Sequence, residues 1–81
     1  MKYDFSNDAM KVIMKLDANT AGRIFKGVMG LPDKGDIKPL KGAPGTFRLR
    51  VGDYRILYRL YGKDSLLIEK IEPRGDVYKG G

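Results

Sequence analysis

Cysteine, histidine and tryptophan are absent from the sequence. The lack of cysteine excludes disulfide bonds, thiolate nucleophiles and cysteine metal sites. The lack of histidine removes the commonest general base and the commonest metal ligand. Any chemistry must therefore use lysine, arginine, tyrosine, aspartate or glutamate, and we expect neither a metal nor a cofactor.

Long apolar runs are also missing. No stretch approaches the roughly 20 apolar residues that a membrane-spanning helix requires, and no apolar signal core follows Met1–Phe5. We therefore expect a cytoplasmic protein. The length of 81 residues predicts a single domain over residues 1–81 with one modest core, since a chain of this size buries roughly 60% of its unfolded surface.

Positive charge is concentrated in one part of the chain. The net charge is +6, and residues 34–63 contain eight basic but only two acidic residues, which accounts for all of it. The remaining residues carry equal numbers of basic and acidic side chains. A localised basic patch indicates nucleic acid or an acidic protein as the partner.

Residues 47–60 have the pattern of a β-hairpin. Apolar and basic side chains alternate from Phe47 to Val51, which is typical of a strand with one buried face. Gly52-Asp53 is a two-residue turn signal, and a second alternating run follows over 54–60. Such a turn fixes the register and predicts these facing pairs: Val51 with Tyr54, Arg50 with Arg55, Leu49 with Ile56 and Arg48 with Leu57.

This register places four arginines on one face of the hairpin, namely Arg48, Arg50, Arg55 and Arg59. Arg50 directly opposite Arg55 is unfavourable in an ordinary sheet, because like charges across a strand pair repel each other. We interpret the arrangement as an anion-binding face. A solvated basic face is the alternative, and for Arg59 so is an ion pair with Glu69 or Glu72.

Shorter patterns surround the hairpin: a strand over 2–5, helices over 7–16 and 19–29, and a long strand over 65–72. Glu69 and Lys70 interrupt the last strand and have no assigned face. Residues 30–46 are rich in glycine and proline, and we predict a connector without an element of its own, with Lys38 and Lys41 exposed.

The predicted fold is α+β: a short N-terminal strand, an antiparallel two-helix hairpin and a three-stranded antiparallel meander. Both helices cover one face of the sheet, and the basic, concave face stays open.

The chain resembles the RelE/ParE toxin superfamily, on the RelE side, over nearly its whole length. The similarity lies in the order of its pieces: Leu40-Lys41-Gly42, the aromatic-basic-x-basic strand at 47–50, Tyr54-Arg55, and the tail Arg74-Gly75-Asp76-Val77-Tyr78. Family members of the RelE kind are ribosome-dependent endoribonucleases that cleave mRNA in the ribosomal A site. The resemblance implies the same activity here. It also implies a co-expressed antitoxin that covers or distorts the basic site, as in type II toxin–antitoxin systems.

The resemblance implies roles for single residues as well. Arg48 and Arg50 match two basic strand positions, and Arg55 matches the phosphate-clamping arginine. Arg74 matches the arginine that steadies the leaving group, and Tyr78 matches the tyrosine that stacks on a base or assists proton removal. The expected RNA-binding residues are Lys38, Lys41, Arg59 and Lys79. RNA can cleave itself when a 2′-OH attacks the next phosphate, so no metal or histidine is required if the ribose is oriented and the phosphorane stabilised.

A departure from the family pattern keeps other functions open. Some relatives carry lysine at the positions of Arg48 and Arg50, and arginine, with a pKa above about 12, is a poor proton donor to the leaving oxygen. Either acid catalysis is weak, or Lys41, Lys70 or Lys79 contributes. The alternatives are a non-catalytic ParE-like inhibitor of DNA gyrase and a decayed module that binds RNA or the antitoxin.

Overall fold

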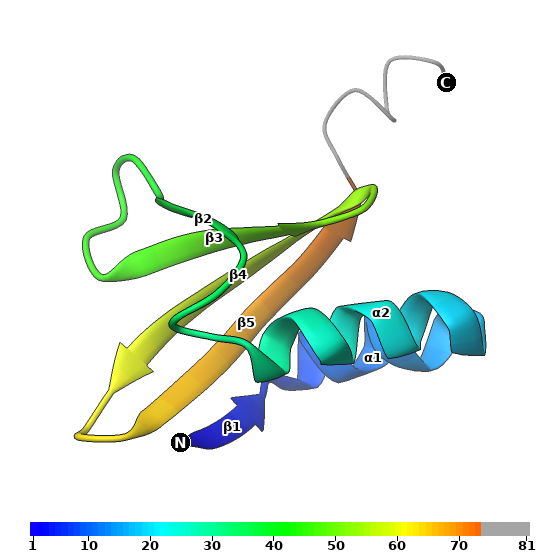
Figure 1. The fold of residues 1–81 in the computed structure, drawn as a ribbon, viewed down its shortest axis with the longest axis horizontal. Coiled ribbons are helices and arrows are strands. Elements are labelled where there is room, and N and C mark those ends of the chain that lie inside the picture. Colours follow the sequence, from blue (N-terminus) through cyan, green and yellow to red (C-terminus); the bar gives the residue numbers. More distant parts are fainter. Residues whose placement is uncertain (74–81) are drawn as a thin grey trace.

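The computed structural model describes residues 1–73, in which two helices and five strands occur (Figure 1). In chain order they are β1 (Lys2–Phe5), α1 (Asn7–Lys15), α2 (Ala18–Met29), β2 (Asp36–Pro39), β3 (Thr46–Val51), β4 (Tyr54–Tyr61) and β5 (Ser65–Pro73). The strands form one sheet in the order β1-β5-β4-β3-β2, in which β1 is parallel to β5 and the other neighbours are antiparallel. The α+β class predicted from the sequence is confirmed. Neither helix in this part of the chain is long and apolar enough to cross a membrane.

The hairpin of β3 and β4 has the predicted register. Arg50 pairs with Arg55, and the other three pairs are also those expected from a two-residue turn. Gly52 has a φ of 57° in this turn, a conformation that glycine adopts without the steric cost of a Cβ. The turn therefore determines which side chains share each face of the hairpin.

The strand β2 corrects the prediction that residues 30–46 form only a connector. Asp36–Pro39 runs antiparallel to β3, with Asp36 opposite Arg50 and Pro39 opposite Phe47. The meander thus has four antiparallel strands instead of three. A four-residue strand that ends in proline carries little alternation, and proline is tolerated because β2 lies at the edge of the sheet.

Side-chain caps determine where both helices begin. The Ser6 hydroxyl accepts a hydrogen bond from the Ala9 N–H (3.0 Å) and donates one to the Glu69 carbonyl oxygen (2.7 Å), which fixes the start of α1 to β5. Asp17 caps α2, and its carboxylate accepts hydrogen bonds from the N–H and the hydroxyl of Thr20. Each predicted helix differs from the observed one by one residue at one end.

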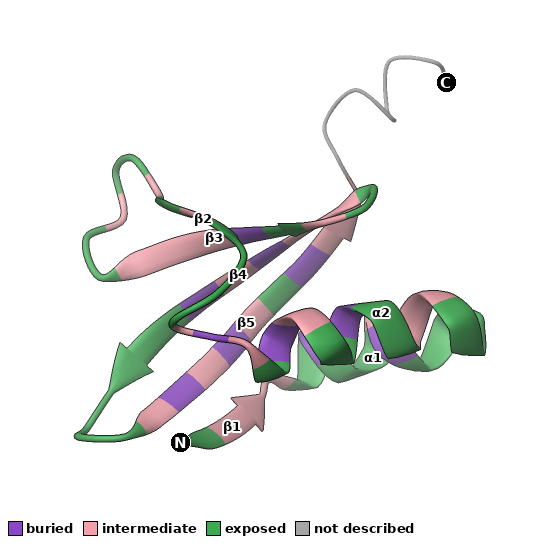
Figure 2. Ribbon diagram, viewed as in Figure 1, coloured by how far each residue is buried: buried purple, intermediate pink, exposed green. Residues whose placement is uncertain are grey.

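Both helices pack on the same face of the sheet (Figure 1). The buried core consists of Ala9, Ile13, Ile24, Val28, Leu31, Leu49, Ile56, Tyr58, Leu66, Ile68 and Ile71. Figure 2 shows the alternation of burial along β5, where buried residues are separated by less buried ones. The side chains that alternate with the core residues point to the opposite face of the sheet.

A β-bulge in β5 determines on which face of the sheet Glu69 and Lys70 lie, which the sequence alone leaves open. Leu57 pairs with Lys70, but the next residue, Tyr58, pairs with Ile68. Glu69 is therefore an extra residue on β5, and the alternation restarts after it. The isoleucines before and after the bulge both reach the core, so Glu69 and Lys70 lie side by side on the opposite face.

Candidate nucleic-acid interface

A row of charged side chains crosses the sheet on the face opposite the helices. The strand registers place Asp36, Arg50, Arg55 and Glu72 next to one another on β2, β3, β4 and β5. Adjacent strands lie about 4.8 Å apart, so two arginines are neighbours and an acidic residue flanks each of them. The predicted juxtaposition of Arg50 and Arg55 is confirmed, whereas the acidic ends of the row were not predicted.

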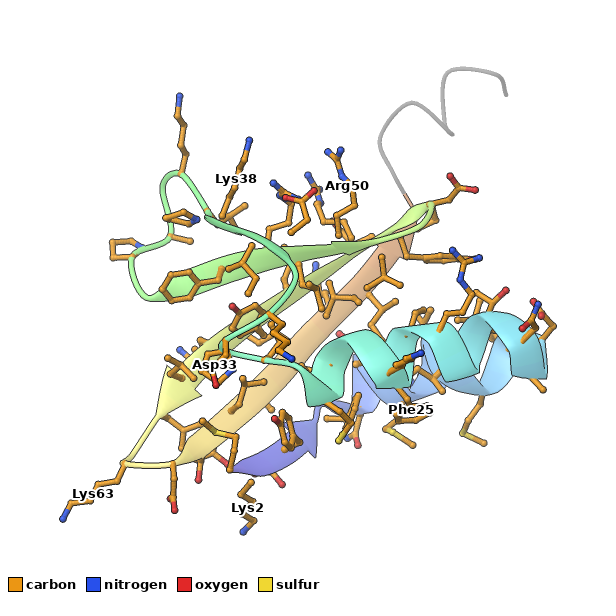
Figure 3. The ribbon with its side chains drawn as sticks, viewed as in Figure 1. Lys2, Phe25, Asp33, Lys38, Arg50 and Lys63 are labelled. Atoms are coloured by element: carbon orange, nitrogen blue, oxygen red, sulfur yellow. The ribbon has the colours of Figure 1, made fainter. Side chains whose placement is uncertain are left out.

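A second row lies beside the first and is basic at both ends. It contains Lys38, Arg48, Leu57 and Lys70, again one residue from each of the four strands. Figure 3 shows Lys38 and Arg50 pointing to the same side of the sheet, away from the helix that carries Phe25. We call these two rows together the basic face, and they bring four of the six expected site residues within 1–73 into one surface, namely Lys38, Arg48, Arg50 and Arg55.

Arg55 forms the best-defined ion pair of the basic face. Its Nε and Nη2 atoms donate hydrogen bonds to Oε1 of Glu72 at 3.1 and 2.6 Å. The arginine side chain is 43% exposed and the glutamate side chain 29%, and such surface pairs contribute only about 0–1 kcal/mol. Glu72 therefore holds the guanidinium in place, but a phosphate can replace it at small cost.

Two further arginines have acidic neighbours and differ in burial. Arg59 Nε lies 3.2 Å from Glu69 Oε2, one of the two partners considered from the sequence. The Arg48 side chain is only 12% exposed, and its Nη2 lies 3.8 Å from Asp36 Oδ1. Its Nη1 is buried and has no hydrogen-bond partner within residues 1–73. An unpaired buried donor is costly, so the Arg48 guanidinium carries a positive charge that its surroundings compensate only in part.

Arg50 and Lys38 are exposed, and neither forms an ion pair with another residue of the described chain. Lys41 is exposed in the loop between β2 and β3. An unpaired cation at the surface attracts anions over a longer range than a cation neutralised by a neighbouring carboxylate. Arg50 and Lys38 are therefore the cations best placed for first contact with a polyanion.

Three expected site residues, Arg74, Tyr78 and Lys79, lie outside residues 1–73, and their roles stay predictions. Conversely, Lys70 and Glu72 belong to the basic face although sequence reasoning did not place them there. The bulge at Glu69 interrupts the alternation of side chains between the two faces of β5, so the sequence pattern does not show on which face Lys70 and Glu72 lie. A glutamate two residues after a lysine in a strand was the available signal, since such residues share a face.

A groove of about 430 Å³ lies on the same face of the sheet. It is lined by Ser6, Asp8, Leu40, Ala43, Thr46, Leu57, Leu67, Glu69 and Lys70. The apolar residues come from the β2–β3 loop, β4 and β5, and the charged residues come from the bulge and the start of α1. We call this feature the bulge groove.

The chemistry available on the basic face is that of guanidinium, ammonium and carboxylate groups. Within residues 1–73 no group of three histidine, cysteine or carboxylate side chains is placed to hold a metal ion. Burial raises the pKa of the Tyr58 hydroxyl, so this core tyrosine stays protonated at neutral pH. The arginines suit phosphate groups, which they bind through two parallel hydrogen bonds.

Comparison with known proteins relates the whole chain to one family. A sequence model of the family described as "ParE toxin of type II toxin-antitoxin system, parDE" matches residues 3–78. A Methanocaldococcus jannaschii protein that carries the name RelE1 is 40% identical over 48 residues, which are 58% of this chain and 53% of that protein. The match therefore spans about half the length of the curated relative.

Solved structures share the fold. The crystal structure of the RelB–RelE antitoxin–toxin complex from Methanococcus jannaschii matches with a TM-score of 0.75 and 25% identity, over 95% of this chain and 96% of that chain. The archaeal RelE–RelB complex from Pyrococcus horikoshii OT3 matches with a TM-score of 0.71 and 26% identity, over 91% and 94%. The intact E. coli RelBE complex matches with a TM-score of 0.75 at 18% identity, over 89% and 94%, which shows a common fold.

Proposed function

The chain belongs to the family of ParE toxins of type II toxin–antitoxin systems, and from this premise we propose that it is a ribosome-dependent endoribonuclease that cleaves mRNA in the A site. The resemblance to the RelE/ParE superfamily inferred from the sequence is confirmed. The observation that carries the proposal is the direct pairing of Arg50 with Arg55 on β3 and β4. Two adjacent arginines favour a phosphate between them, because each offers a planar fork of donors and the anion relieves their repulsion.

The proposed reaction uses the RNA's own nucleophile. The 2′-oxygen forms a bond to the adjacent phosphorus, the bond from phosphorus to the 5′-oxygen breaks, and the products are a 2′,3′-cyclic phosphate and a 5′-hydroxyl. The proton of the 2′-OH passes to water, and the departing 5′-oxygen takes a proton from water. Arg50 and Arg55 hold the phosphate and stabilise the extra negative charge of the phosphorane, and the positive charge of the largely buried Arg48 next to them favours the same anion.

The residues of the tail complete the proposed site. In our proposal Arg74 steadies the leaving group, and Tyr78 stacks on a base or assists proton removal, as the family resemblance implies. Lys38, Lys41, Arg59 and Lys79 contact the RNA backbone. Orienting the ribose for in-line attack is a further contribution that such a site can make without metal or histidine.

The proposed partners are the ribosome, its mRNA and a cognate antitoxin, and the proposed location is the cytoplasm, where translation takes place. All three solved structures reported above are complexes of a RelE toxin with a RelB antitoxin. A similar antitoxin would silence this chain by covering the basic face with acidic side chains, since complementary charge is what such a face selects.

A non-catalytic inhibitor of DNA gyrase is the second candidate function. The parDE description of the matching family favours it, and so does the absence of lysine at positions 48 and 50, where arginine is a poor proton donor. A gyrase supercoiling assay distinguishes the two, because the nuclease proposal predicts no inhibition of the purified enzyme.

Cleavage by purified components tests the proposal. We expect the full chain to cut a defined message on purified translating ribosomes and to leave the free message intact. The Arg50→Ala/Arg55→Ala variant should lose at least about 100-fold in rate, because removing one preorganised charge donor costs that much. Lys63→Ala is the matched control, since Lys63 lies in the β4–β5 turn, far from Arg50 (Figure 3). Full activity of a folded double variant would overturn the proposal.

A further inference from the structure

We propose that the bulge groove binds one nucleobase of the RNA strand whose phosphates lie on the basic face, and that guanine is the base it fits best. This inference rests on the proposed function and adds a base-recognition site to it. The groove's volume of about 430 Å³ falls in the range of roughly 300–1,000 Å³ that is usual for small-molecule sites.

The apolar part of the groove suits the flat face of a base. Leu57 of β4 and Leu67 of β5 come from neighbouring strands on the same face, and Leu40 and Ala43 of the β2–β3 loop line the groove as well. Leu57 and Leu67 are both half-buried. Every base has an apolar face, and contact with such a surface removes it from water.

The groove is continuous with the cations that would hold the backbone. Leu57 pairs with Arg48 on one side and with Lys70 on the other, and Leu67 pairs with Arg59. Paired residues have Cβ atoms about 5 Å apart. A nucleotide whose phosphate binds Arg48 or Arg59 therefore has its base within reach of the leucines.

The charged end of the groove distinguishes the bases. The bulge sets Glu69 beside Lys70 on this face, and Asp8 reaches the groove from the start of α1. Guanine alone presents two adjacent N–H donors, N1 and N2, beside the acceptor O6. A carboxylate can accept from both donors while the Lys70 ammonium donates to O6.

Some hydrogen-bond acceptors at the charged end of the groove are already engaged by neighbouring groups, and others are not. Glu69 Oε2 lies 3.2 Å from Arg59, and the Ser6 hydroxyl already donates to a backbone carbonyl and accepts from a backbone N–H. Oε1 of Glu69 and the Asp8 carboxylate have no hydrogen-bond partner among the described side chains. These two carboxylates are therefore the acceptors that remain for the guanine edge.

Binding of synthetic RNA to the full chain tests the proposal. The probes are fluorescent 2′-O-methyl oligoribonucleotides, which cannot undergo 2′-OH attack, with a central guanine, adenine, uracil or abasic site. Fluorescence anisotropy at one fixed salt concentration gives the affinities. We expect the guanine probe to bind about tenfold more tightly than the abasic probe, as burial of one face of a base against apolar side chains contributes on this scale, and the other bases to lie between them.

Two variants locate the effect in the groove. Leu57→Asn should remove the difference between the guanine and abasic probes, whereas Leu60→Asn, at an exposed leucine of the same strand, should retain it. Ala43→Leu, which fills the groove instead of making it polar, should act like Leu57→Asn and serves if that variant does not fold.

The outcomes separate this inference from the proposed function. Equal binding of the guanine and abasic probes by the unaltered chain would overturn the base site, while salt-dependent binding of both would leave the nuclease proposal standing. A guanine preference that survives in folded Leu57→Asn and Ala43→Leu would also overturn it. Absence of binding to every probe would overturn the base site, and cleavage of the message on translating ribosomes would still uphold or contradict the nuclease proposal separately.

Discussion

The ion pair between Arg55 and Glu72 controls how accessible the proposed phosphate clamp is. Glu72 Oε1 accepts both guanidinium hydrogen bonds, so RNA must replace it before Arg55 can contact a phosphate with the same donors. An exposed pair of this kind contributes at most about 1 kcal/mol. Glu72 thus positions the arginine and lowers its affinity for other anions by a small factor.

The variant Glu72→Gln should therefore bind RNA roughly threefold more tightly, because a surface ion pair of about 0.2–1 kcal/mol no longer competes with the phosphate. Anisotropy with a 2′-O-methyl oligoribonucleotide measures the change. Asp64→Asn in the β4–β5 turn alters the net charge equally and is the control. Equal gains in both variants would mean that net charge, and not release of Arg55, is responsible.

The sequence predicts only some of the residues that lie on the basic face. The four arginines follow from alternation and from the two-residue turn at Gly52-Asp53, because both are local signals. Their acidic partners Asp36 and Glu72 come from β2 and β5, and those contacts depend on strand registers that no local pattern specifies.

At the scale of elements, the helices begin and end where local chemistry dictates. Ser6 and Asp17 cap them, and Gly30 is the C-cap of α2. Such signals lie within a few residues of the boundary, which is why the helices could be predicted. β2 and the bulge in β5 could not be predicted, because a short edge strand and an inserted residue can be recognised only from their pairing with other strands.

The Asp17 cap predicts a pH dependence of stability. The hydrogen bond from the Thr20 hydroxyl lowers the pKa of the Asp17 carboxyl below its ordinary value of 3.8. A lowered pKa in the folded state means that the cap stabilises fully above pH 3.8 and that this stabilisation is lost as the pH falls through the lower folded value. Thermal unfolding from pH 7 to pH 2 measures it.

Asp17→Asn keeps a capping oxygen but cannot titrate. The difference in melting temperature between the unaltered chain and this variant should stay constant at neutral pH and shift against the unaltered chain below about pH 4. A pH-independent difference would show that the charge of Asp17 contributes nothing to the cap.

Two glycines of α2 should respond oppositely to alanine. A Cβ at Gly22 would meet nothing within 4 Å, so Gly22→Ala should stabilise the protein by about 0.5–1 kcal/mol through helix propensity. A Cβ at Gly27 would lie 2.7 Å from Val51 Cγ2. Val51 is β-branched and stiff, so the overlap should cost about 1–3 kcal/mol, more than the propensity gains.

Denaturant unfolding of both variants measures these changes. Similar stabilisation by both substitutions would mean that α2 can move away from β3, and would contradict the packing described here.

At the scale of the whole molecule, the helices and the basic face lie on opposite sides of the sheet. The helices bury their apolar side chains on one face of the sheet, and the basic face opposite them carries five basic and two acidic side chains. The α+β class and the basic character of this face could be predicted because both are sums over many residues. The bulge groove could not, since it forms where β4, β5, a loop and the start of α1 meet.

The positive charge of the basic face predicts that RNA binding depends steeply on salt concentration. The logarithm of the binding constant should fall with the logarithm of salt concentration with a slope of about −3, which corresponds to four or five phosphates on a single strand. Arg50→Ala should reduce the magnitude of the slope by about 0.7, and Lys63→Ala should leave it unchanged. A slope near zero would exclude the basic face as a backbone-binding surface.

Mapping of new RNA ends in growing cells tests the nuclease proposal most directly. The chain would be expressed briefly, and 5′-hydroxyl ends would be sequenced across all messages, beside an Arg55→Ala variant of equal abundance. We predict new 5′-hydroxyl ends confined to translated regions and absent from the variant. Growth arrest without new ends, or the same ends in the variant, would contradict the account.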